Sequence, residues 1–294
     1  MVHTICLPED NNNHSFLKQE LSGKLLISSS MGPFFITIFS IAAAGLLFIF
    51  LFRIKKKPRA TTVPVEPIPG SYRQILSEQV LFYQQLDEIR KKEFENRIQQ
   101  FLSQTKITGV NTVVQDQDRV LIAASAIIPI FNFPGWEYIH LHEVLLYPDS
   151  FNHEFEQQGS RRDVLGMVGN GALNHVMILS QHKLRQAFIN KTGKDNTAIH
   201  EFVHLIDKTD GDIDGIPAFI LEKKYIQPWL QLMQHEIRLI IEDKSDIDPY
   251  GATNEAEFFA VVSEYFFERP KLLKEKHPKL YELLEKIFCK QPIA

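Results

Sequence analysis

The sequence predicts an α+β domain in which a small sheet packs against helices. Apolar side chains recur at helical spacing over residues 78–102, with a charged opposite face, and predict a helix there. Residues 138–147 alternate partly and are rich in β-branched and aromatic side chains, which predicts a strand. Residues 176–179 predict a second, shorter strand. Helices and strands mixed in this way are typical of α+β domains.

A second helix is expected over residues 121–131, an uninterrupted apolar run that ends near Pro129. The run is too short to cross a membrane, so it predicts a helix in the core of the domain.

The composition is that of an ordinary globular protein. The chain has 294 residues, 44% of them hydrophobic and 23% charged, enough for one sizeable domain or two small ones. The net charge of −4 and the absence of a basic, aromatic-rich strand pattern argue against direct binding of nucleic acid. Cys6 and Cys289 lie near opposite ends of the chain and indicate incidental thiols rather than a disulfide framework.

Three segments are expected before this domain. Residues 1–30 are polar, with a run of asparagines, and predict a disordered tail. Residues 31–52 carry no charge, and 22 such residues are enough for a helix to cross a hydrocarbon core of about 30 Å. The length of this run and the absence of a polar face argue against a buried helix of a soluble domain. No small-residue cleavage site follows the run, which argues against a cleaved signal peptide, so a transmembrane helix is favoured.

Residues 53–70 form a basic and proline-rich linker between this helix and the domain, which covers residues 71–294. Positive charge beside a membrane helix tends to stay in the cytoplasm. The expectation is therefore a single-pass membrane protein with a cytoplasmic catalytic domain, at a bacterial inner membrane. Translation could start at Met1 or at Met31, and the sequence leaves both open.

The strongest chemical signal is the H-E-x-x-H pattern formed by His200, Glu201 and His204. On a helix, residues four apart lie on one face, so both imidazoles could bind one Zn²⁺ while Glu201 acts as general base. The flanking positions are apolar, which indicates a helix buried on its other sides. Three residues able to cap the start of this helix precede Ala198: Asp195, Asn196 and Thr197.

A zinc site of this type needs a third protein ligand. The metzincin pattern is excluded because Asp207 and Asp210 stand where it requires glycine and histidine. Glu257 is the best candidate, since it begins a strongly apolar helix in which an unpaired carboxylate is costly. The residues alone equally allow it to be a half-exposed charge at a helix start. Glu264 lies two turns further on the same face and could accept a hydrogen bond from a ligand, whereas Glu255 points elsewhere.

Asp207 has two possible roles. It lies on the helical face of both histidines and could orient an imidazole, or it could close the helix into the following loop. The acidic run Asp210-x-Asp212-x-Asp214 indicates a turn-rich loop rather than a calcium site, because the twelfth position is not glutamate. His140-x-His142 lacks a third ligand and indicates surface or core histidines.

Several stretches together resemble the Mlc titration factor A family of zinc peptidases, over about residues 75–290. They are residues 200–207, the segment Gly211-Asp-Ile-Asp-Gly-Ile-Pro, Asp248-Pro-Tyr-Gly-Ala, residues 257–267, Leu121-Ile-Ala-Ala, Gly135-Trp136 and Leu146-Tyr147-Pro148. The resemblance implies a zincin-like fold similar to the catalytic domain of anthrax lethal factor. It implies that His200, His204 and Glu257 bind Zn²⁺, that Glu201 is the base and that Tyr250 supports the oxyanion.

The expected function is that of a membrane-anchored zinc peptidase acting on a peptide or protein. The resemblance implies aminopeptidase activity. The alternative is a regulatory protein that sequesters a transcriptional repressor or another partner, with catalysis secondary, as the family name suggests. The full set of ligands and base favours catalysis.

Overall fold

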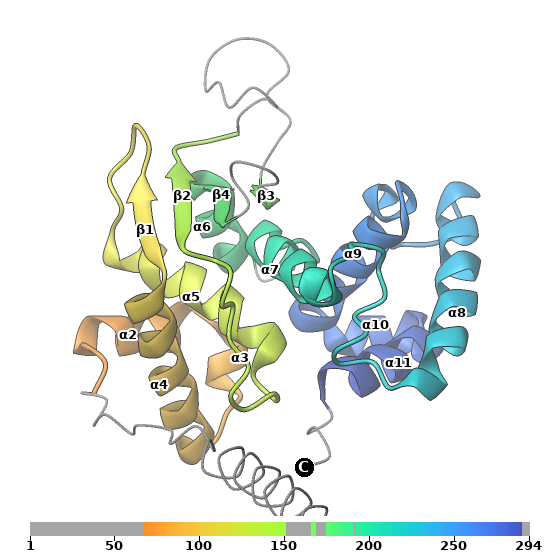
Figure 1. Ribbon diagram of the computed structural model, residues 1–294, viewed down its shortest axis with the longest axis horizontal. Coiled ribbons are helices and arrows are strands. Elements are labelled where there is room, and N and C mark those ends of the chain that lie inside the picture. Colours follow the sequence, from red (N-terminus) through yellow and green to blue (C-terminus); the bar gives the residue numbers. More distant parts are fainter. Residues whose placement is uncertain (1–66, 151–165, 169–174, 191, 290–294) are drawn as a thin grey trace, which may run out of the picture. The chain divides into compact units, whose positions relative to one another are not determined.

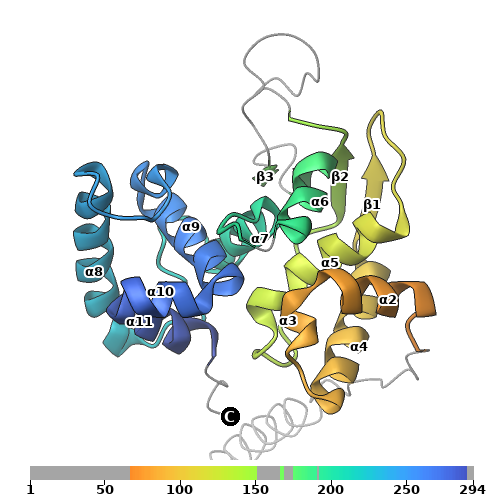
Figure 2. The ribbon, with the colours of Figure 1, turned by 180° about the vertical axis from the view of Figure 1, so that it is seen from behind.

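The computed structural model describes residues 67–150, 166–168, 175–190 and 192–289, drawn as coloured ribbons in Figures 1 and 2. These described residues belong to one compact unit. The helices are α2 (Gly70–Gln79), α3 (Leu81–Gln84), α4 (Glu88–Gln104), α5 (Asp116–Ile130), α6 (Gln181–Ile189), α7 (Thr197–Asp207), α8 (Lys223–Ile241), α9 (Glu255–Glu268), α10 (Pro270–Lys276) and α11 (Pro278–Phe288). The strands are β1 (Lys106–Gly109), β2 (Glu143–Tyr147), β3 (Gly166–Val168) and β4 (Val176–Ser180), and two 3-10 helices are η2 (Lys208–Asp210) and η3 (Pro249–Ala252).

The described strands form one small mixed sheet with the order β1-β2-β4-β3. β1 is parallel to β2 and β2 is parallel to β4, whereas β3 runs antiparallel to β4 at the edge. Parallel neighbours require a long crossover, and α5 lies in the connection from β1 to β2. A small sheet with packed helices confirms the predicted α+β class, and the strand predicted over residues 176–179 is β4.

α5 lies at the centre of the helical packing. Every side chain from residue 120 to residue 130 is buried, so the helix is covered on all sides, as the apolar run over residues 121–131 predicts. A capping box between Gln115 and Asp118 starts the helix earlier than the apolar run alone indicated. The helix ends one residue after Pro129. The predicted core helix is confirmed.

The single helix predicted over residues 78–102 is wrong, because this stretch belongs to α2, α3 and α4. Val80 has an extended backbone (φ −98°, ψ 96°) and interrupts the first helix. Asp87 Oδ1 then accepts hydrogen bonds from the backbone nitrogens of Ile89 and Arg90, at 3.0 and 2.8 Å, and starts α4. The apolar period continues across both breaks because all three helices bury side chains in the same core.

Only part of the strand predicted over residues 138–147 exists, as β2. The first residues form a turn in which Leu141 N donates to Tyr138 O at 2.9 Å. The Tyr138 ring packs against Trp136 and Phe202, with centroid distances of 4.6 and 5.0 Å. These aromatic residues therefore fill the core rather than pair in the sheet.

The prediction of a single-pass membrane protein is corrected by the structure. Among the described residues, no helix is both long and apolar enough to cross a membrane. α5 is apolar but has 15 residues, and α8 has 19 but carries several charges, whereas a span needs about 20 mainly apolar residues. The predicted tail (1–30), the predicted span (31–52) and residues 53–66 of the predicted linker lie outside the described residues.

An ion-pair network joins α8 to the C-terminal helices. His277, between α10 and α11, contacts Glu236 of α8 through Nδ1 (3.1 Å) and Asp246 through Nε2 (2.8 Å). Asp246 also binds Lys194 and Lys276, at 2.6 and 3.0 Å. The hydrogen bond to Glu236 and then that to Asp246 raise the pKa of His277, so its imidazolium donates from both nitrogens. The network holds the chain just before η3.

Replacing His277 by alanine is expected to lower the free energy of unfolding by about 1–3 kcal/mol at pH 6, because Glu236 is left buried without its donor. The pKa of His277 is raised in the folded state, so its contribution is complete below pH 6.5 and declines as pH rises through the folded pKa. Urea unfolding of both proteins at pH 6 and pH 10 measures this. Exposed His182, changed to alanine, is the control. An equal loss at both pH values would contradict the assignment.

Candidate metal centre

α7 positions the two histidines and the glutamate of the H-E-x-x-H pattern. Of the three residues able to cap it, Asn196 does so, since its Oδ1 accepts a hydrogen bond from Ile199 N at 3.2 Å. Most of the helix is buried against α5 and α9. His200 and Glu201 are also buried, with 7% and 6% of their surface exposed, and they line a cleft together with His204.

α9 brings a carboxylate to the same place. Asn254 caps this helix by accepting a hydrogen bond from Glu257 N at 2.9 Å, which sets Glu257 in the first turn. α9 packs along α7, and Glu264 lies two turns beyond Glu257 on the face toward it. Glu255 is exposed, as expected.

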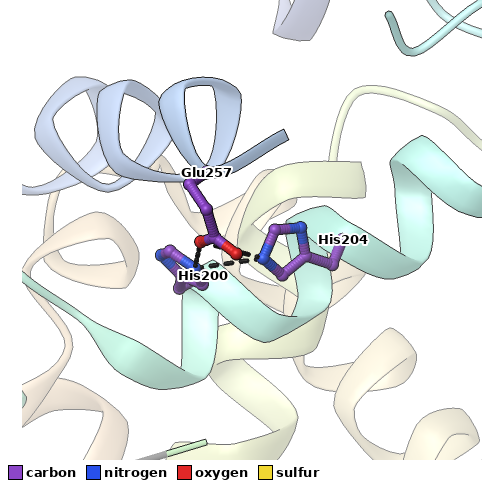
Figure 3. Close-up of side chains that lie close together, drawn as sticks. All are labelled: His200, His204 and Glu257. Atoms are coloured by element: carbon purple, nitrogen blue, oxygen red, sulfur yellow. Dashed lines mark hydrogen bonds and ion pairs between the residues drawn. The ribbon is translucent and has the colours of Figure 1, made fainter. Parts of the chain in front are cut away.

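Three potential ligand atoms converge between these helices, as Figure 3 shows. Glu257 Oε2 lies 2.9 Å from His200 Nε2 and 3.4 Å from His204 Nε2, and the two nitrogens are 3.1 Å apart. Ligands around a tetrahedral Zn²⁺ lie roughly 3.3 Å from one another. The donor set therefore fits such an ion with small adjustments. Within the described part of the chain, this is the one group of three such residues whose ligand atoms lie this close together.

Glu264 orients His200. Nδ1 of His200 donates to Glu264 Oε1 at 2.7 Å, which leaves Nε2 directed at Glu257 and His204. The other oxygen of Glu264 accepts a hydrogen bond from Asn196 N, at the start of α7. Burial opposes a charge on His200, but the hydrogen bonds with Glu257 and Glu264 outweigh it and raise the pKa of this histidine.

The other two residues proposed for chemistry also lie beside the ligands. Burial raises the pKa of Glu201, and the nearby histidines oppose this effect. Tyr250, in η3, is 54% exposed, and its ring centroid lies 5.9 Å from that of His200. Burial and then the charge of Glu257 raise the pKa of the Tyr250 hydroxyl, which keeps it protonated as a hydrogen-bond donor.

Asp207 closes the end of α7 into the loop that follows. Its Oδ2 accepts a hydrogen bond from Gly215 N at 2.8 Å, and burial raises the pKa of the carboxyl to about 6. Asp207 Oδ1 and His204 Nδ1 are both buried without a hydrogen-bond partner in the described structure. The loop-closing role predicted for Asp207 is thus observed, and the role of orienting His204 stays a prediction.

Glu268 was not predicted. This half-buried carboxylate lies one turn beyond Glu264 on α9, and its Oε1 accepts a hydrogen bond from Asn196 Nδ2 at 2.8 Å. Burial raises the pKa of Glu268 to about 7. Its spacing of four residues from Glu264 was the available signal, since residues four apart share a helix face.

The other acidic and histidine clusters noted in the sequence lie in an exposed loop or at the surface. Asp210 and Asp214 are exposed and accept hydrogen bonds from Asp212 N and Ile216 N in the same loop, as expected for a turn-rich segment. His140 and His142 are exposed surface residues.

The site opens into a cleft of about 1720 Å³. α7, α9, η3 and strand β3 all contribute to its walls. A volume of this size accommodates several residues of an extended peptide.

An α+β domain with a His-His-Glu group at such a cleft defines a metallopeptidase-like protein. The family model described as glucose-regulated metallo-peptidase M90 matches residues 53–289, and the chain belongs to this family. Membership implies a bound metal, and the donor set described above fits one.

Three relatives are similar to this chain over about two thirds of its length or more. Mlc titration factor A of Pectobacterium atrosepticum is 30% identical over 212 residues, which cover 66% of this chain and 77% of that protein. The protein of the same name in Escherichia fergusonii is 30% identical over 213 residues, with the same coverage. Uncharacterized protein slr2042 of Synechocystis is 31% identical over 242 residues, 77% of this chain and 86% of that protein. The resemblance to the Mlc titration factor A family is confirmed.

Replacing Glu268 by glutamine is expected to raise the free energy of unfolding at pH 8 by an amount on the order of 1 kcal/mol. The folded-state pKa of this carboxyl is raised to about 7 from an ordinary value of 4.5. The contribution of Glu268 to folding stability is therefore complete below pH 4.5 and is lost as the pH rises through 7. Glutamine keeps the acceptor for Asn196 without the charge. Urea unfolding at pH 5 and pH 8 should show a gain that is largest at pH 8. Glu275→Gln, at an exposed position, is the control, and destabilisation by E268Q at pH 8 would contradict the assignment.

Proposed function

We propose that residues 71–294 form a zinc-dependent peptidase domain that hydrolyses peptide bonds. The observation that carries this proposal is the convergence of His200, His204 and Glu257, with Glu201 on the same turn of helix. Structural zinc sites usually have four protein ligands, whereas three protein ligands facing a cleft leave a position open for water or substrate.

Zinc, when bound, supplies a Lewis acid that polarises the scissile carbonyl and lowers the pKa of a water molecule. Glu201 accepts a proton from this water as the water attacks, and passes it to the leaving amine. The Tyr250 hydroxyl donates a hydrogen bond to the oxygen on which negative charge develops. Glu264 holds His200 in the tautomer that presents Nε2 to the ion. In this proposal Asp207 has the same role toward His204, because Asp207 Oδ1 and His204 Nδ1 are each buried with no hydrogen-bond partner in the described structure.

We further propose that this peptidase is an aminopeptidase. Carboxylates from Asp214, Asp243 and Asp248 line the cleft, while Lys194, one of its cations, is already paired with Asp246. A cleft with this charge favours a protonated amino terminus over a carboxylate.

A regulatory binding function is the second proposal. Relatives that match two thirds of this chain are named Mlc titration factor A, and the name points to interaction with the repressor Mlc. In this proposal the chain binds a transcription regulator, and peptide cleavage is secondary.

Replacing Glu201 by glutamine is expected to lower kcat for peptide hydrolysis by about 10²–10⁴-fold, because the base is lost. Zinc should stay bound, since the three ligands are unchanged. Peptide hydrolysis and metal content of both proteins are the measurements, with exposed Glu78→Gln as the matched control. Unchanged cleavage with zinc bound would exclude Glu201 as the general base, whereas no cleavage by the zinc-loaded wild type would favour the regulatory proposal.

Replacing Glu257 by glutamine is expected to weaken zinc binding by at least about 100-fold, more than the loss of a residue that only orients a ligand. Competition with a zinc chelator measures this. Glu255→Gln, two residues away on the exposed side of α9, is the control and should bind zinc like the wild type. Equal affinity in all three proteins would remove Glu257 from the ligand set.

A further inference from the structure

Strand β3 passes directly beside the H-E-x-x-H turn. It forms the edge of the sheet, where Gly166 pairs with Leu179 and Met167 with Ile178 of β4. β3 also packs against α7, and Gly166 lines the same cleft as Glu201. A backbone segment far from the helix in sequence thus lies against the residue proposed as the base.

Gly166 leaves no room for a side chain. A Cβ atom at this position would lie 2.7 Å from both Cγ and Oε1 of Glu201, and 2.9 Å from Cγ2 of Thr197. Non-bonded carbon atoms normally approach to about 3.5–4.0 Å, so one of these groups would have to move. The contact includes Cγ of Glu201 and not only the flexible end of its side chain.

Space, rather than backbone conformation, is what requires glycine at this position. The described glycines with a positive φ are Gly135, Gly211 and Gly215, and Gly166 is not among them. An alanine could adopt the backbone of Gly166 but could not fit beside Glu201. Glu201 lines the cleft and is 6% exposed, so a Cβ at residue 166 would push its side chain out of this buried position.

We propose that Gly166 is a positioning residue, whose missing side chain leaves the space in which Glu201 is held toward the cleft. The inference rests on the proposed peptidase function for its effect on activity, but the packing it describes is independent of catalysis. In this proposal, strand β3 limits the side-chain rotamers that Glu201 can adopt.

Gly166→Ala is expected to lower kcat by about 10–100-fold, since a displacement near 1 Å of a reacting group has an effect of this size. KM should stay within about twofold, and zinc content should be unchanged, because none of the three ligands is touched. Gly70→Ala is the matched control, since a Cβ there meets nothing within 4 Å. An unchanged kcat, or a rise in KM alone, would overturn the proposal.

A second measurement needs no activity. Gly166→Ala should lower Tm by several degrees in the wild-type background and by less in the Glu201→Ala background, where Cγ and Oε1 are absent. An equal decrease in both backgrounds, or failure to fold in both, would overturn the proposal. Folding only in the Glu201→Ala background would support it. If the wild type cleaves no peptide, the peptidase proposal fails while this comparison still tests the packing.

Discussion

The pairing of α7 with α9 is the constraint on which the site depends. α9 is largely buried, yet it carries Glu257, Glu264 and Glu268 on the face toward α7. Carboxylates in such a place are unfavourable unless each finds a donor. α7 and its cap supply those donors through two imidazoles and the amide groups of Asn196. The contacts that join the helices are therefore the contacts that arrange the site.

The local half of the site could be predicted because it lies within one turn of helix. A spacing of four residues places His200 and His204 on one face whatever surrounds them. Glu257 lies 57 residues from His200, and its own sequence context fitted a surface charge equally well. Only the pairing of two distant helices brings it to the histidines. The four-residue spacing from Glu264 places Glu268 on the same helix face, but its contact with Asn196, the cap of α7, appears in no sequence pattern.

The sequence did not predict β1 and β3, because these short strands form through pairing with neighbouring strands rather than through a pattern of their own. β1 and β3 have four and three residues and each includes a glycine, so neither shows alternation that a sequence pattern could reveal. Conversely, the core gives α2, α3 and α4 one continuous apolar period, which concealed the breaks at Val80 and Asp87. Apolar spacing reports which face is buried more reliably than where a helix ends.

The metal centre would join two helices that are each started by an asparagine cap. Asn196 starts the helix of the histidines, and Asn254 starts the helix of the glutamate through the backbone of Glu257 itself. A cation held by both helices would act as a cross-link between segments 57 residues apart, present in the folded chain and absent from the unfolded one. By mass action it would add to the folding stability of the domain. Cellular supply of the ion would then govern the lifetime of the protein against proteolysis as well as its chemistry.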